Sequence, residues 1–276
     1  MSLVYSLTST DITLSVPCFS LERTLDCGQA FRWRALEDGL FEGVVHGKVL
    51  RLSQQEDKIT FYRTTPQDMA LYWNDYFDLP RDYEAIDRLL CRDDRLRTAA
   101  ADARGIRLLR QEPWEALCTF ILSQNNNIPR IKGIVERLCR DLGQEVEEGY
   151  FAFPTPERLA GCRPEDLASA RCGFRTKYLL DAARRVAGGA IDLASLYAMP
   201  IDEARANLQT IYGVGAKVAE CTLLYGFGRL ECFPMDVWMK RVMASLFPDG
   251  LPADFTQIAG VAQQYLFHYG RIHKIK

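Results

Sequence analysis

Short apolar runs with intervening turns dominate the chain up to about residue 85. The runs occupy residues 31–34, 41–45, 49–52 and 58–62. They are separated by polar segments at residues 37–39, 46–48 and 54–57. Each separating segment contains Gly or Asp, which are typical of hairpin turns. The pattern predicts an antiparallel β-sheet.

Beyond that point apolar residues recur every three or four positions, which is the period of an α-helix. One face carries Trp114, Leu117, Phe120, Ile121 and Gln124; a second, ended by Gly143, carries Ile131, Ile134, Val135, Leu138 and Leu142. Further helices are predicted over residues 164–172, 177–187 and 254–269, the first two ending at glycine. The fold class is therefore α+β, with an N-terminal antiparallel β-sheet domain over residues 1–105 and an α-helical domain over residues 106–276.

Composition and charge narrow the class of protein. With 276 residues and 48% apolar content, the chain can bury a sizeable core. A net charge of −2 provides no global attraction to nucleic acid, which counts mildly against DNA binding. Backbone amides and a few arginines can still bind phosphates, and arginine greatly outnumbers lysine here.

The nine cysteines are scattered and form no C-x2-4-C pair. This spacing predicts reduced thiols and no metal site. The first sixteen residues lack a basic segment followed by a long apolar one, and no run of about 18 apolar residues occurs. We expect a cytoplasmic protein that is neither secreted nor membrane-bound.

Gly213-Val214-Gly215 lies between two apolar, helix-like segments. A tight turn of this kind directs backbone N–H groups outward, where they suit a phosphate oxygen. Lys217 then falls in the first turn of the following helix, where a cation opposes the helix dipole at a cost of roughly 0.3–1 kcal/mol. This position favours the neutral, nucleophilic amine. From the local sequence alone, a surface lysine that binds phosphate remains an open interpretation.

Asp236 follows Pro234 and precedes an apolar-periodic segment at residues 237–246. It is predicted to cap that helix, because a side-chain oxygen there accepts from free backbone N–H groups. Such a carboxylate is held ionised and fixed, which also suits stabilisation of a developing cation. The structural and catalytic interpretations are compatible.

Three blocks of the sequence together resemble the 8-oxoguanine DNA glycosylases. They are Gly28-Gln29-Ala30-Phe31-Arg32-Trp33, Asn125-Asn126-Asn127-Ile128-Pro129-Arg130, and the hairpin with Lys217 and Asp236. The similarity runs from about Leu14 to Phe267. It implies a helix–hairpin–helix glycosylase domain and a bifunctional DNA glycosylase/AP lyase of base excision repair. The implied partner is double-stranded DNA containing 8-oxoguanine, bound by a monomer without a cofactor.

The resemblance also implies roles in catalysis and in binding of a flipped-out base. Lys217 would attack C1′ and form a Schiff base that leads to β-elimination, and Asp236 would stabilise the cationic sugar. The Gly28 carbonyl would accept from N7–H, which 8-oxoguanine has and guanine lacks. Cys221 and Phe267 would sandwich the base, and Gln263 would bond its Watson–Crick edge. By residue type alone, Cys221 and Phe267 would be assigned to the core.

On the DNA side, the resemblance implies that Asn125 fills the space left by the flipped nucleotide. Arg130 and Arg175 would bind the orphaned cytosine, which gives a preference for cytosine opposite the lesion. Phe174 could wedge into the base stack. The backbone of Gly213, Val214 and Gly215 would hold a phosphate.

The sequence departs from the vertebrate-type pattern near the proposed pocket. Trp238 stands where those enzymes carry histidine, and His268-Tyr269-Gly270 lacks the acidic residue that they have after the phenylalanine. These changes leave the proposed nucleophile in place. They affect the detailed contacts to the base and one contact to a DNA phosphate.

Three other functions are considered. An endonuclease III-like enzyme normally carries four cluster-binding cysteines after the aspartate, whereas no cysteine follows Cys232. A monofunctional alkyladenine-type glycosylase would lack Lys217. A DNA-binding module could use the hairpin only as a phosphate clamp, and an incision assay would separate that class from an enzyme.

Overall fold

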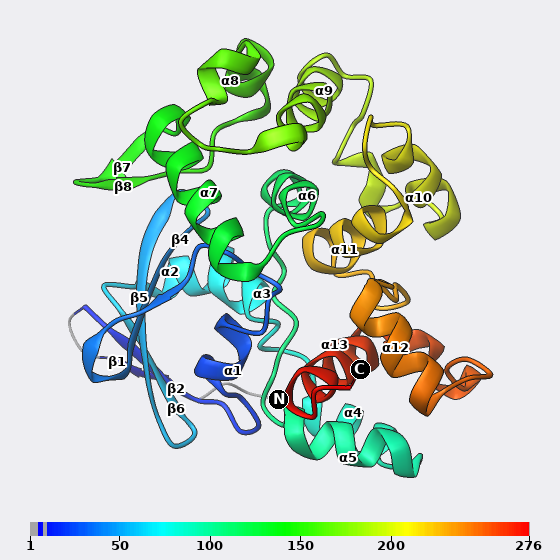
Figure 1. Ribbon diagram of the computed structural model, residues 1–276. Coiled ribbons are helices and arrows are strands. Elements are labelled where there is room, and N and C mark those ends of the chain that lie inside the picture. Colours follow the sequence, from blue (N-terminus) through cyan, green and yellow to red (C-terminus); the bar gives the residue numbers. More distant parts are fainter. Residues whose placement is uncertain (1–4, 8–9, 276) are drawn as a thin grey trace.

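The computed structural model describes residues 5–7 and 10–275. Residues 1–4, 8–9 and 276 lie outside it, and so does part of the N-terminal segment for which no targeting signal is expected. A six-stranded antiparallel sheet lies on one side of the molecule, and helices make up the other (Figure 1). The strands, in the order β1-β2-β6-β5-β4-β3, are β1 (Tyr5–Leu7), β2 (Ile12–Ser15), β6 (Lys58–Tyr62), β5 (Lys48–Gln55), β4 (Leu40–Val45) and β3 (Arg34–Ala35).

The predicted strands at 41–45, 49–52 and 58–62 are confirmed as β4, β5 and β6. His46 and Gly47 join β4 to β5 with φ of +51° and +66°, the two left-handed positions of a tight hairpin turn. The predicted strand at 31–34 is wrong except at its last residue. Trp33 lies instead in the sheet-side core against Gly43, where a Cβ would stand 2.8 Å from the indole ring.

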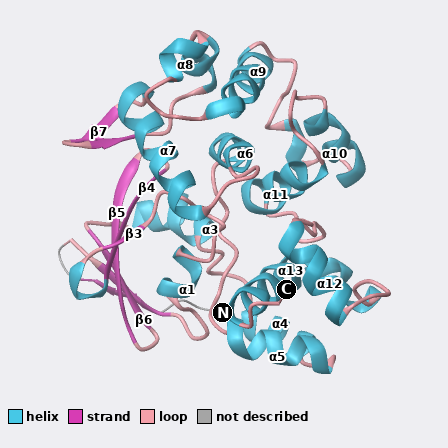
Figure 2. Cartoon of the chain, viewed as in Figure 1, coloured by secondary structure: helices cyan, strands magenta, loops and turns pink. Residues whose placement is uncertain are grey.

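The helices follow in chain order and supply most of the fold (Figure 2). They are α1 (Leu21–Leu25), α2 (Pro66–Asp68), α3 (Asn74–Tyr76), α4 (Tyr83–Leu90), α5 (Asp94–Ala103), α6 (Pro113–Leu122), α7 (Ile128–Leu142), α8 (Pro156–Ala160), α9 (Thr176–Ala187), α10 (Ile201–Gln209), α11 (Ala216–Phe227), α12 (Val237–Leu246) and α13 (Ala259–Ile272). A π-helical turn (Met69–Trp73) joins α2 to α3, and a small hairpin, β7 (Glu145–Glu147) and β8 (Tyr150–Phe151), follows α7.

Two predicted helices differ from the structure. Only residues Pro164–Leu167 of the segment 164–172 are helical, as a 3₁₀ turn, because the chain then continues through further turns toward Gly173. The segment 254–269 is divided into a 3₁₀ turn (Ala253–Ile258) and α13. Two of the glycine stops are confirmed, since Gly143 ends α7 and Gly188 ends α9. The third is wrong, because Gly173 begins a 3₁₀ turn (Gly173–Arg175) instead of ending a helix.

The described residues pack into two hydrophobic cores. One joins the sheet to α1 and the segment from Met69 to Leu79, and the other joins the helices from α4 onward. Helices α4 and α5 belong to the helical core, where α5 packs against α13 (Figure 1). The buried apolar residues between Tyr83 and Ala103 therefore belong to the helical core and not to the sheet-side core. None of the described helices is both long and apolar enough to span a membrane.

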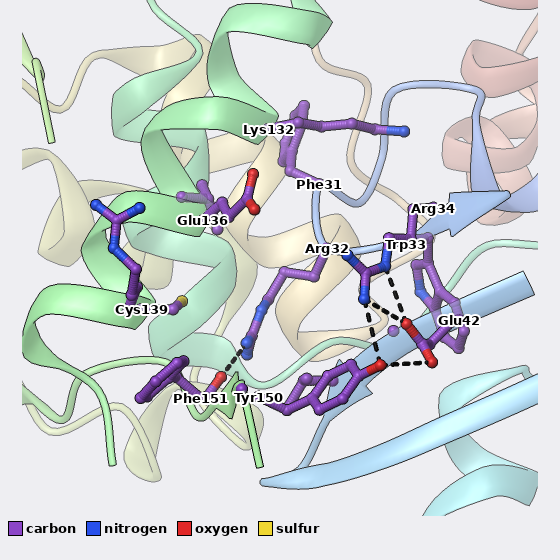
Figure 3. Close-up of a pocket in the computed structure, with 15 residues that line it drawn as sticks. Phe31, Arg32, Trp33, Arg34, Glu42, Lys132, Glu136, Cys139, Tyr150 and Phe151 are labelled. Atoms are coloured by element: carbon purple, nitrogen blue, oxygen red, sulfur yellow. Dashed lines mark hydrogen bonds and ion pairs between the residues drawn. The ribbon is translucent and has the colours of Figure 1, made fainter. Parts of the chain in front are cut away.

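The β7–β8 hairpin is clamped to the sheet beside a cavity of about 320 Å³. Glu42 on β4 is buried, and its carboxylate accepts from Arg34, from Arg51 at 2.6 Å and from the Tyr150 hydroxyl at 2.9 Å. Burial by itself raises the pKa of Glu42, but the hydrogen bonds from Arg34, Tyr150 and Arg51 outweigh burial and hold this pKa below its usual value. Arg32 donates to the Phe151 carbonyl on the same hairpin (Figure 3). None of the predicted site residues lines this cavity.

Candidate active site

The Gly213–Gly215 hairpin joins α10 to α11, as the sequence predicts. Gly213 has a φ of +81° and packs under Tyr178, so that a Cβ there would stand 2.4 Å from the ring. Val214 is buried and donates its N–H to the Ile211 carbonyl at 3.0 Å. Among the described residues, no acceptor takes the N–H of Gly213, Gly215 or Lys217. These amides, rather than that of Val214, are the groups that the turn can offer to an anion.

Lys217 is the second residue of α11 and is half-buried. Its Nζ donates to Ser123 Oγ at 3.0 Å and lies 5.0 Å from the centre of the Phe120 ring. Lys217 forms no ion pair with any carboxylate in the described part of the chain. The amine is therefore held by a hydroxyl and an aromatic face, both from the C-terminal part of α6 and the residue that follows it.

Asp236 is the N-cap of α12, as predicted, and its Oδ1 accepts from the Met239 N–H at 2.7 Å. The preceding loop is tied down on α11, because the Phe233 N–H donates to Glu220 at 2.6 Å. Glu220 is in turn paired with Arg205 of α10. Asp236 is thus a fixed carboxylate at a helix N-terminus, on a loop that the hairpin helices anchor.

Cys221 connects these two groups electrostatically. Burial raises the pKa of the Cys221 thiol, the positive charge and hydrogen bond of Lys217 lower it, and the negative charge of Asp236 adds to the increase. Cys221 lies one turn after Lys217 on α11, so these two side chains share a face of the helix. Cys221 is 3% exposed and remains a neutral thiol at neutral pH.

The predicted base-binding residues come from three separate parts of the chain. Gly28 follows α1, Cys221 lies on α11, and Gln263 and Phe267 lie one turn apart on α13. A Cβ at Gly28 would stand 3.9 Å from the Phe267 ring and 3.0 Å from Ile128 of α7, which places these segments side by side. The Tyr225 hydroxyl, one turn beyond Cys221, donates to Gln264 at 2.7 Å and approaches Gln263 at 3.5 Å. Helices α11 and α13 are thereby linked through the Tyr225 hydroxyl.

Gly28 has a φ of +91° and is anchored by its neighbour Gln29. The fully buried Gln29 amide donates to the carbonyls of Thr24 and Arg107, at 3.0 and 2.8 Å, and accepts from the Leu109 N–H at 2.9 Å. Its backbone carbonyl accepts from Gln111 at 2.6 Å. This network fixes the Gly28 backbone, which a rigid carbonyl contact to a ligand requires.

The asparagine run forms the connection between α6 and α7. Asn125 is exposed with a φ of +47°, a conformation that asparagine tolerates, and Asn127 caps α7 by accepting from the Arg130 N–H at 3.0 Å. Arg175 is only 2% exposed and donates to the carbonyls of Gln124 and Asn125, the latter at 2.8 Å. The buried Arg175 side chain therefore holds the backbone of this loop in place.

Arg130 and Phe174 differ from Arg175 in being exposed. The Arg130 side chain forms no ion pair among the described residues, and Phe174 is 50% exposed with the Arg175 guanidinium 4.3 Å from the centre of its ring.

The sequence did not predict three neighbours of the hairpin and of the Asn125 loop. Lys177 lies 5.2 Å from the ring centre of exposed Tyr212, and Ser123 holds Lys217. Ser123 directly precedes the Gln124-Asn125 pair, and this adjacency was its only signal.

Comparisons with known proteins identify the family of this chain. Residues 11–117 match the family model of the 8-oxoguanine DNA glycosylase N-terminal domain, and residues 118–250 match that of the HhH-GPD superfamily of base excision DNA repair proteins. A probable N-glycosylase/DNA lyase of Methanothermobacter thermautotrophicus is 30% identical over 92% of this chain and 94% of its own. The N-glycosylase/DNA lyase OGG1 of Arabidopsis thaliana is 30% identical over 96% of this chain and 75% of its own.

A solved structure supports the same assignment. The 8-oxoguanine glycosylase/lyase of Clostridium acetobutylicum, in complex with double-stranded DNA containing cytosine opposite 8-oxoG, is 34% identical and superimposes with a TM-score of 0.93 over 99% of both chains. The predicted α+β fold is confirmed by this likeness and by the two family models. The chain belongs to the 8-oxoguanine DNA glycosylase family of N-glycosylase/DNA lyases.

Proposed function

We propose that this enzyme excises 8-oxoguanine from duplex DNA with Lys217 as the nucleophile and that it prefers cytosine opposite the lesion. The observation that carries the proposal is the neighbourhood of Lys217. A half-buried amine without an ionic partner among the described residues lies in the first turn of α11, next to a turn whose N–H groups suit a phosphate. A fixed carboxylate, Asp236, caps the next helix on a loop that is hydrogen-bonded to Glu220 of α11.

The chemistry proceeds in two stages. The neutral amine of Lys217 forms a bond to C1′ while the glycosidic bond breaks, and the base leaves with the electron pair and takes up a proton. Loss of a proton from nitrogen and opening of the sugar ring give a protonated imine. Removal of a proton from C2′ then expels the 3′ phosphate and cleaves the strand.

Asp236 acts on the first stage without leaving its helix. Positive charge develops on the sugar as the glycosidic bond breaks, and a preorganised carboxylate lowers the energy of that charge. The Met239 N–H holds the carboxylate in place at the start of α12. Asp236 therefore needs no rearrangement during the reaction.

Selection of the damaged base rests on Gly28. Its carbonyl accepts from a base that carries N7–H and faces a lone pair in guanine, a difference of about 1–3 kcal/mol for one buried bond. Three residues complete the pocket: Cys221 and Phe267 lie on the two faces of the base, and Gln263 bonds its edge. The anchored Gln29 network supports this assignment, because a mobile carbonyl would not discriminate.

Contacts to DNA come from three places. The Gly213–Gly215 hairpin holds a phosphate, Asn125 enters the space left by the flipped nucleotide, and Phe174 wedges beside it. Arg130 is exposed and reads the orphaned cytosine through its N3 and O2 acceptors. Arg175 is engaged by Gln124 and Asn125, so in this proposal it contributes mainly by holding Asn125 in place.

We place this activity in the cytoplasm, with the chromosome. All nine cysteines are free thiols, and several are buried with a raised pKa, such as Cys139 at about 12. Scattered reduced thiols of this kind suit a reducing compartment.

The proposal is tested by single-turnover base release and strand cleavage on a duplex with 8-oxoguanine opposite cytosine. The wild type should release the base and cleave the strand. Lys217→Gln should lose both, and Asp236→Asn should slow base release by at least ~100-fold, as expected when a transition-state charge partner is removed. Full activity of Lys217→Gln would overturn the proposal.

A further inference from the structure

Ser123 is the residue that holds the Lys217 amine in place. It caps the C-terminus of α6, and its Oγ donates to the Phe120 carbonyl at 2.7 Å. The same Oγ accepts from Lys217 Nζ at 3.0 Å. Because a hydroxyl has only one proton, and that proton is committed to Phe120, Ser123 meets the amine as an acceptor.

This bond restricts a side chain that is otherwise flexible. Lysine has four rotatable side-chain bonds, and its amine has no fixed direction in solvent. An acceptor on one N–H and the Phe120 ring on another side leave the remaining directions of Nζ defined. The Phe120 ring is itself stacked on Tyr225, with centres 5.2 Å apart and an angle of 19° between the planes. The support beneath the amine is therefore rigid.

Ser123 also joins the amine to the loop that the proposed function places in the DNA. Gln124 and Asn125 follow it directly, and the buried Arg175 guanidinium holds the carbonyls of both. The position of Oγ is thus set by the same loop that carries Asn125. A shift of the loop on binding DNA would move the acceptor of the nucleophile with it.

We propose that Ser123 is a positioning residue for the reaction. The hydrogen bond from Lys217 Nζ to its Oγ orients the amine toward C1′, and this orientation depends on the position of the loop that carries Asn125. The inference rests on the proposed role of Lys217 as nucleophile. In this role Ser123 acts through Lys217 and not on the substrate itself, so DNA binding should be retained when its hydroxyl is removed.

The test compares Ser123→Ala with Ser123→Thr, which retains a hydroxyl acceptor. Thr119→Val is the matched control, because Thr119 lies on α6, is buried and donates only to the Ala116 carbonyl, at 3.1 Å. Lys217→Gln is measured in parallel. Single-turnover base release and borohydride trapping are recorded on a duplex with 8-oxoguanine opposite cytosine. Affinity is measured separately on a duplex with a tetrahydrofuran abasic analogue, and folding by the thermal unfolding midpoint.

Ser123→Ala should slow base release and trapping by roughly 10- to 100-fold, as a misplaced reacting group does. Its affinity for the analogue should stay within about twofold of wild type, and Ser123→Thr should recover most of the rate. A wild-type rate in Ser123→Ala overturns the inference. So does a loss of rate accompanied by equal losses of affinity and thermal midpoint without recovery in Ser123→Thr, because that pattern indicates a structural role only.

Failure of the proposed function would be recognised separately. If Lys217→Gln still forms the trapped adduct, the nucleophile lies elsewhere and the inference about Ser123 falls with it. If Lys217→Gln is inactive while Ser123→Ala has the wild-type rate, only the role of Ser123 is refuted.

Discussion

Replacing Gly213 by alanine should damage both folding and DNA binding, for two separable reasons. The φ of +81° is left-handed, which costs an alanine about 1–2 kcal/mol. In addition, the new Cβ would stand 2.4 Å from the Tyr178 ring, and overpacking of this kind costs about 1–3 kcal/mol. The free energy of unfolding should therefore fall by about 2–5 kcal/mol.

Gly189→Ala provides the matched control. Gly189 has a similar φ of +74°, with nothing within 4 Å of the methyl group that alanine would add, so it carries only the backbone cost of about 1–2 kcal/mol. Urea unfolding of both variants gives the difference, expected at about 1–3 kcal/mol from the overpacking alone. Affinity for duplex DNA should weaken in Gly213→Ala and not in Gly189→Ala, because only the first substitution forces the Gly213–Gly215 hairpin to move.

The double variant Gly213→Ala, Tyr178→Ala tests the source of the difference. Removing the ring should eliminate most of the overpacking cost, so the two substitutions should couple favourably in a double-mutant cycle. Equal destabilisation by Gly213→Ala and Gly189→Ala, or a coupling energy near zero, would refute the packing explanation of this glycine.

Three further predictions concern stability and specificity. Glu42→Gln should cost about 2 kcal/mol at neutral pH, because the buried side chain loses the charge with which it accepts hydrogen bonds from Arg34 and Arg51, whereas Tyr150→Phe should cost about 1 kcal/mol. Urea unfolding that ranks the two variants the other way would contradict this account of how the β7–β8 hairpin is held to the sheet. Burial raises the pKa of Glu115 to about 7, so the folded protein binds the proton of this carboxyl more tightly than the unfolded chain does. The free energy of unfolding should therefore fall as pH rises from about 5 to 7, by about 3 kcal/mol at most. Glu115→Gln should flatten that pH dependence, and an unchanged slope would rule out Glu115 as its source. Arg130→Ala should reduce the cytosine-over-adenine rate ratio by roughly tenfold, since a good arginine contact to a base discriminates by about 1–3 kcal/mol; an unchanged ratio would refute the preference.

Local features of this fold could be predicted from the sequence because their causes are local. Asp236 caps α12, since it has a side-chain oxygen before an apolar-periodic segment. Gly143 and Gly188 end their helices for equally local reasons. The position of Lys217 in the first turn of α11 followed from the hairpin glycines.

Long-range packing was not predictable in this way. The segment 31–34 alternates like a strand, but Trp33 is used to fill the core against Gly43. The contact between Gly28 and Phe267 joins opposite ends of the chain, and nothing in either local sequence requires it. Strands β1 and β2 were missed because they are short and are held by long-range pairing, β1 with β2 and β2 with β6.

Arg175 is the site residue whose environment differs most from what its type suggests. From its residue type, an arginine near a DNA-binding loop is expected to be exposed and to contact a phosphate or a base, because most arginines are exposed. Its guanidinium is buried under Gln124 and Asn125 because those carbonyls, in a loop between two helices, lack backbone partners. That these two carbonyls lack backbone donors can be seen only in the folded loop.

The most direct test of Lys217 as the nucleophile is to trap the imine and find the residue that carries it. A duplex with 8-oxoguanine opposite cytosine is incubated with the enzyme and borohydride, the covalent complex is digested, and the DNA-linked peptide is sequenced by mass spectrometry. The account predicts that the reduced sugar is attached to Lys217 and that Lys217→Gln gives no adduct. Attachment to any other residue, or an adduct that survives the substitution, would contradict it.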